Sequence, residues 1–107
     1  MKQIKTNSEL NEALNKDDNL HVIKFYGTWC GPCRMLHDII NNIEPIYENV
    51  TFYEIDIDDC EEELLEQYSI SSIPVLLFYK GSFQVDRTLG GLPESKLREK
   101  IEENNNK

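Results

Sequence analysis

Two cysteines separated by two residues, Cys30 and Cys33, are the side chains of this sequence best suited to chemistry. A Cys-x-x-Cys pair can close into a disulfide when its β-carbons lie about 3.5–4.5 Å apart, and the first turn of a helix brings them that close. Pro32 favours a helix start, because its fixed φ suits the first turn and no N–H is needed there. Cys30 would then face unpaired N–H groups and the positive end of the helix dipole, which stabilise a thiolate. The spacing therefore predicts an exposed, nucleophilic Cys30 and a buried, resolving Cys33 for disulfide exchange.

The same pair could instead form a static structural disulfide or half of a zinc site. A zinc site needs about four ligands, and only Cys60, His21 and His37 are available to complete one. We interpret Cys60 as a passive thiol near the start of a helix. The alternative is a secondary redox or thiolation site, which the neighbouring acidic residues disfavour by raising the pKa of its thiol.

Alternating strands and helices are predicted around this motif. The expected strands are residues 2–5, 20–26, 50–57, 75–79 and 83–88; the expected helices are residues 8–16, 33–48, a third beginning near Asp58 and a last one beginning at Pro93. Strand–helix alternation gives parallel pairing by right-handed crossovers, and the closing hairpin adds antiparallel strands. The fold class is therefore α/β, with a central mixed sheet of about five strands flanked by four helices, in a single domain spanning residues 1–107.

Local signals mark the ends of several elements. Thr6 followed by Glu9 is a capping-box pattern for the first helix. Pro45 lies late in the second expected helix, where it is expected to disturb the last turn. Residues 102–107 are polar, and we expect them to form a frayed tail.

The pentapeptide Trp29-Cys30-Gly31-Pro32-Cys33, preceded by a buried strand, resembles the active site of the thioredoxin family. The similarity extends along nearly the whole chain, including Ser72-Ile73-Pro74 and Leu89-Gly90-Gly91. The resemblance implies the thioredoxin fold and a small monomeric reductase of protein disulfides. It also implies that no cofactor is bound and that an NADPH-dependent thioredoxin reductase regenerates the dithiol.

Further residues are assigned to the site by the same resemblance. Pro74 resembles the cis-proline that faces the cysteines, and a cis bond after Ile73 would expose backbone groups to an extended substrate segment. Gly90 and Gly91 resemble a loop of small residues that borders the same groove. Trp29 would cover the disulfide as an exposed apolar platform.

Lys24 departs from the family pattern, which usually has a buried Asp six residues before the first cysteine. A lysine within a covered strand is costly unless it is paired or deprotonated. Many bacterial members place a Lys on the following strand beside that Asp, and the corresponding position here is Glu54. We therefore hypothesise a charge-exchanged Lys24–Glu54 pair; the alternative is that Lys24 reaches the sheet edge and touches nothing. A cationic Lys24 would lower the pKa of the nearby thiols and stabilise the dithiol, whereas a neutral one could act as a base.

Asp38 also replaces a proline that often kinks the second helix of the family.

Composition narrows the range of partners. The formal net charge of −9 at pH 7 argues against nucleic acid and favours partners with a positive patch. No apolar run approaches the roughly 20 residues of a membrane span, and the first five residues contain no apolar signal region, so we expect a cytoplasmic location.

Two other functional interpretations remain open. One is an oxidant or isomerase of the protein disulfide isomerase type, which Lys24 mildly favours and the Gly31-Pro32 dipeptide disfavours. The other is a scaffold subunit in which the redox chemistry is incidental.

Overall fold

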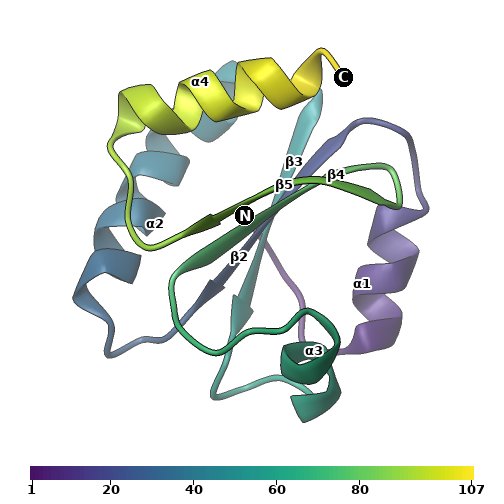
Figure 1. Ribbon diagram of the computed structural model, residues 1–107, viewed down its shortest axis with the longest axis vertical. Coiled ribbons are helices and arrows are strands. Elements are labelled where there is room, and N and C mark those ends of the chain that lie inside the picture. Colours follow the sequence, from purple (N-terminus) through teal and green to yellow (C-terminus); the bar gives the residue numbers. More distant parts are fainter.

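The computed structural model describes residues 1–107 as a five-stranded sheet with helices on both faces (Figure 1). The strands are β1 (Lys2–Gln3), β2 (Leu20–Tyr26), β3 (Val50–Asp56), β4 (Val75–Lys80) and β5 (Phe83–Leu89). The helices are α1 (Asn7–Leu14), α2 (Gly31–Ile43), α3 (Glu62–Gln67) and α4 (Glu94–Asn105), with a 3₁₀ helix at Glu44–Ile46. The predicted mixed α/β sheet with four α-helices is confirmed.

The strand order β1-β3-β2-β4-β5 places β2 at the centre of the sheet. β3 pairs in parallel with both β1 and β2, whereas β4 pairs antiparallel with both β2 and β5. The carboxyl end of β2 leads directly into the Cys-x-x-Cys motif at the start of α2, so the motif is anchored to the central strand of the sheet.

No helix has the length and apolar character needed to cross a membrane.

Each face of the sheet has its own hydrophobic core. Residues of α1 and α3 pack on one face and residues of α2 and α4 on the other, as the arrangement of the helices in Figure 1 shows. Successive side chains of a strand point to opposite faces, so Ile23 and Phe25 of β2 enter the first core while Leu20 and Val22 enter the second. Lys24 continues this second series. Its side chain is therefore directed to the α2–α4 face.

α1 begins with the predicted capping box. The Thr6 hydroxyl accepts a hydrogen bond from the Glu9 N–H at 3.0 Å, and a Glu9 carboxylate oxygen accepts one from the Thr6 N–H at 2.9 Å. Each partner satisfies an N–H group that the first turn of a helix leaves free.

α2 differs from the prediction at both ends. It begins at Gly31 because Cys30 itself is the N-cap, and it ends at Ile43, five residues before the predicted end. Pro45 has no N–H and its ring would clash with the carbonyl of an α-helical turn, so the chain continues as the 3₁₀ helix. The helix is uninterrupted at Asp38, where the family often has a proline.

α3 begins at Glu62, four residues later than predicted. Before it, the Asp56 carboxylate accepts a hydrogen bond from the Asp58 N–H at 2.9 Å. This local side-chain contact favours a turn over a helix at residues 57–60.

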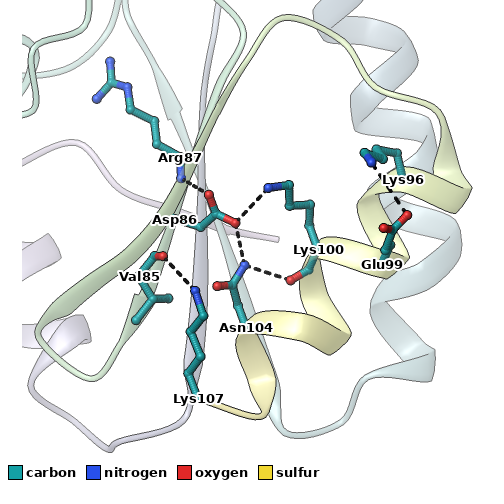
Figure 2. A network of polar contacts seen from close by, with 8 residues as sticks. All are labelled: Val85, Asp86, Arg87, Lys96, Glu99, Lys100, Asn104 and Lys107. Carbon is teal, nitrogen blue, oxygen red and sulfur yellow. Dashed lines mark hydrogen bonds and ion pairs between the residues drawn. The ribbon is translucent and has the colours of Figure 1, made fainter.

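The expectation of a frayed tail is wrong, because α4 continues to Asn105. Asn104 is completely buried, and its side-chain amide donates to the Asp86 carboxylate on β5 at 2.8 Å. Lys100 donates to the same carboxylate at 3.1 Å (Figure 2). Lys107 adds a bond to the Val85 carbonyl at 3.3 Å, also drawn in Figure 2. These contacts attach residues 102–107, a polar segment with no apolar side chain that could pack into the core.

Candidate redox site

Cys30 and Cys33 form a disulfide at the amino end of α2, with their α-carbons 5.3 Å apart. The Cys30 sulfur accepts a hydrogen bond from the Cys33 N–H at 3.3 Å, so it occupies the place of a capping oxygen. This is the arrangement predicted to stabilise a thiolate at Cys30. Cys30 is less exposed than predicted, at 7% against 2% for Cys33.

No group of three or more His, Cys, Asp and Glu side chains is arranged to hold a metal ion. His21 is engaged elsewhere, with Nδ1 2.8 Å from the Tyr53 hydroxyl and Nε2 3.0 Å from the Asp17 carboxylate.

Trp29 is 64% exposed, as its predicted role as a platform requires. Its indole N–H donates to the Asp58 carboxylate at 2.7 Å. A β-carbon at Gly27 would lie 2.8 Å from the indole ring and 3.0 Å from the Ile73 side chain, so only glycine lets the ring lie this close. Asp58 and Gly27 orient Trp29. The sequence analysis missed both, because nothing in their spacing links them to the tryptophan.

The Ile73–Pro74 peptide bond is cis. The Pro74 carbonyl accepts a hydrogen bond from the N–H of Gly90, whose φ of +87° is readily adopted only by glycine. A β-carbon at Gly91 would lie 3.7 Å from the Pro32 side chain, which places this glycine beside the cysteine motif. The loops predicted to border a substrate groove are therefore held together next to the disulfide.

A mostly apolar hollow of about 400 Å³ continues this surface between Pro32, Met35 and the residues after Gly91. Met35 on its border is 69% exposed.

Lys24 and Glu54 face each other in the register of β2 and β3, as hypothesised. The Lys24 Nζ lies 3.8 Å from the nearer Glu54 carboxylate oxygen and 4.8 Å from the centre of the Tyr26 ring. The Lys24 side chain is only 1% exposed, so the alternative in which it reaches the sheet edge is wrong. Burial lowers the pKa of Lys24, and the negative charges of Glu54 and Asp38 offset only part of that effect.

His37 is a third member of this cluster that the sequence analysis considered only as a metal ligand. Its Nδ1 lies 3.0 Å from the Lys24 Nζ and 3.6 Å from the Glu54 carboxylate. His37 follows Cys33 by four residues on α2, and this helical spacing was the available signal. A pocket of about 360 Å³ is lined by Lys24, Cys33 and His37, together with residues that include Thr28, Arg34 and Asp38.

Cys60 lies apart from this site as a half-buried free thiol. Burial raises its pKa, and the surrounding carboxylates of Asp56, Asp59, Asp58 and Glu61 raise it further. The predicted effect of the acidic neighbours is present, with burial as the larger cause.

Comparison with known proteins decides the family. The thioredoxin profile matches residues 2–103 of the chain. The chain belongs to the thioredoxin family. It is 38% identical to thioredoxin-2 of Saccharomyces cerevisiae over 91 residues, covering 85% of this chain and 86% of the yeast protein. It is 34% identical to human thioredoxin over 104 residues, covering 96% and 97% of the two chains.

Solved structures give the same assignment. Fasciola hepatica thioredoxin superimposes with a TM-score of 0.90 at 32% identity, covering 97% of this chain and 99% of the other. Plasmodium falciparum thioredoxin superimposes with a TM-score of 0.87 at 27% identity, covering 96% and 98%. With the Cys30–Cys33 pair at disulfide distance, this member of the family is a thiol–disulfide oxidoreductase of the protein-disulfide reductase type.

Proposed function

We propose that Cys30 is the nucleophile and Cys33 the resolving thiol in the reduction of protein disulfides. The Cys30 thiolate attacks one sulfur of a substrate disulfide, which forms a mixed disulfide and releases the other substrate sulfur as a thiolate. Cys33 then loses its proton and attacks the Cys30 sulfur. This second step closes the Cys30–Cys33 disulfide and releases the remaining substrate sulfur.

The hydrogen bond from the Cys33 N–H to the Cys30 sulfur is the observation that carries this proposal. It places the sulfur of Cys30, and not that of Cys33, at the amino end of α2, where free N–H groups and the helix dipole favour negative charge. Cys33 lies inside the first turn, and its sulfur reaches that of Cys30, to which it is bonded in the structure.

The substrate groove is proposed to lie between Trp29 and the two loops beside the disulfide. An extended substrate segment would pair with the backbone at Ile73, next to the cis peptide bond to Pro74. Gly90 and Gly91 leave room for its backbone, because they carry no side chains. Gly31 and Pro32 are exposed beside these glycines.

The remaining assignments follow from family membership and charge. We propose a monomeric, single-domain protein of the cytoplasm that needs no bound cofactor. An NADPH-dependent thioredoxin reductase would return two electrons and two protons to the disulfide. The net charge of −9 favours donor and substrate proteins with a positive docking patch and disfavours nucleic acid.

Trapping of substrates tests the roles of the two cysteines. Cys33→Ser lacks the resolving thiol, so it should accumulate mixed disulfides between Cys30 and disulfide-containing proteins, visible on non-reducing gels and removed by dithiothreitol. Cys30→Ser should trap none. Equal trapping by both variants would contradict the assigned roles, and full biological activity of both would favour the scaffold interpretation.

A further inference from the structure

His37 is the member of the Lys24 cluster that reaches solvent. Its side chain is 44% exposed, compared with 1% for Lys24 and 18% for Glu54. Its Nδ1 faces inward, 3.0 Å from the Lys24 Nζ. The imidazole therefore connects a buried amine to the surface.

The hydrogen-bonding capacities fix the direction of this contact. A lysine ammonium has only donors, so when Lys24 is protonated the His37 Nδ1 accepts from it and the imidazole is neutral. If the proton passes to Nδ1, the resulting imidazolium lies 3.6 Å from the Glu54 carboxylate, which stabilises its charge. His37 can thus accept a proton from Lys24 without an uncompensated charge.

Cys33 lines the same pocket as Lys24 and His37. The pocket of about 360 Å³ that Lys24 and His37 line also has Cys33 in its wall, and a water molecule needs only about 10–15 Å³ of such space. The pocket is therefore large enough to hold water beside both Cys33 and Lys24. Burial lowers the pKa of Lys24, which makes its ammonium a better proton donor to His37.

We propose that His37 removes the proton that Cys33 must release to resolve the mixed disulfide, by way of Lys24. This inference rests on the proposed role of Cys33 as the resolving thiol. As the thiol gives its proton through water to Lys24, Lys24 gives one to the Nδ1 of His37. The Cys33 thiolate then attacks the Cys30 sulfur, and the electron pair of the broken mixed disulfide leaves on the substrate thiolate. His37 returns its extra proton to solvent, so protons and electrons balance.

Other charged or titratable groups face the proposed proton path from α2, β2 and β3. Arg34 and Asp38 lie on α2, Tyr26 on β2 and Glu54 on β3. The Arg34 guanidinium donates to the Thr28 carbonyl at 3.2 Å, so it is held by the loop before α2. The carboxylates of Asp38 and Glu54 offset part of the effect of burial on the pKa of Lys24. None of these groups replaces His37, because none of them contacts Lys24 as closely from a position half in solvent.

The test separates the two steps of exchange by rapid mixing of the reduced protein with excess glutathione disulfide. Attack by Cys30 depends on the glutathione disulfide concentration and resolution by Cys33 does not; acid quenching and mass spectrometry follow the mixed disulfide. His37→Asn keeps an acceptor near the Nδ1 position but does not titrate. It should slow resolution about tenfold at pH 7 and leave attack within twofold, a modest share of the usual effect of a lost proton acceptor.

The pH profile provides a readout that a merely structural role would not change. In the parent protein, resolution should rise with pH as neutral imidazole becomes available. This rise should be absent in His37→Asn and restored in His37→Ala by added imidazole. Asn41→Ala, an exposed change one turn further along α2, should match the parent protein in both steps.

Three results would overturn the inference. The first is a resolution rate within twofold of the parent protein in both His37 variants. The second is slow resolution in His37→Ala with normal resolution in His37→Asn, and the third is an equal slowing of attack and resolution. The second result would mean that His37 only positions Lys24. A Cys33→Ser variant that traps no mixed disulfide would instead contradict the proposed function, so the two failures are distinguishable.

Discussion

Lys24 places a cationic side chain beside the resolving cysteine, where the family usually has an acid. Its position on β2 puts it opposite Glu54 and under α2, and the side chain is almost fully enclosed. The contacts with Glu54 and His37 supply acceptors for the ammonium, yet its pKa is still lowered because desolvation outweighs them. The Lys24 ammonium therefore gives up its proton more readily than an exposed lysine does. The same desolvation lowers the stability of the folded state.

Replacement of Lys24 by Met should reveal this cost. Because the folded state lowers the pKa of Lys24 below 10.5, the unfolded chain binds more protons between the lowered value and 10.5, and stability rises with pH across that window. Lys24→Met lacks this dependence. Its stability relative to the parent protein should therefore fall as the pH approaches 10. Urea titrations at pH 7, 8.5 and 9.5 measure the difference.

An exposed lysine provides the matched control for this experiment. Lys16→Met should keep a stability profile parallel to that of the parent protein. A Lys24→Met variant with a constant stability difference at every pH would contradict the account of a desolvated Lys24.

α2 and α4 cover the same face of the sheet, but different interactions determine where each one ends. α2 begins at a sulfur cap and ends where Pro45 cannot continue an α-helix. α4 is anchored by Leu97 and Ile101 in the core and, in its last turn, by Asn104 on Asp86. Burial opposes ionisation of Asp86, but hydrogen bonds from Asn104, the Arg87 N–H and Lys100 outweigh it, and the pKa is lowered.

Removal of the Asn104 amide should loosen the end of α4. Asn104→Ala leaves the Asp86 carboxylate without one of its donors and should destabilise the fold by about 1–3 kcal/mol. Chemical denaturation gives this value, and hydrogen exchange should show faster opening confined to residues 102–107. Asn106→Ala, on the exposed cap of the same helix, should change stability by less than about 0.5 kcal/mol. Equal effects of the two substitutions would show that the contact with Asp86 contributes nothing to the attachment of α4.

The molecule as a whole follows its hydrophobic pattern closely. Alternating strands and helices, the capping box of α1 and the cysteine motif all depend on short-range rules, and these elements form as predicted. Two errors have local causes: Pro45 ends α2 early, and the contact between Asp56 and the Asp58 N–H delays the start of α3. The others occur where a distant partner decides. Residues 102–107 look disordered until Asp86 of β5 receives the Asn104 amide. The family resemblance predicts the Lys24–Glu54 pair, and the register of β2 and β3 agrees with it. The contact of His37 with Lys24 depends on how α2 packs on the sheet, and the spacing of His37 from Cys33 is its only signal in the sequence.

The reduction potential of the Cys30–Cys33 pair tests the central claim most directly. Equilibration against a defined dithiothreitol or glutathione buffer should give a value near −270 mV, typical of thioredoxins. This value is expected because the Glu54 carboxylate compensates the charge of Lys24, and because burial lowers the pKa of the amine. A value above about −220 mV would mean that an uncompensated cation stabilises the dithiol. That result would contradict a general reductant and indicate an oxidant or isomerase instead.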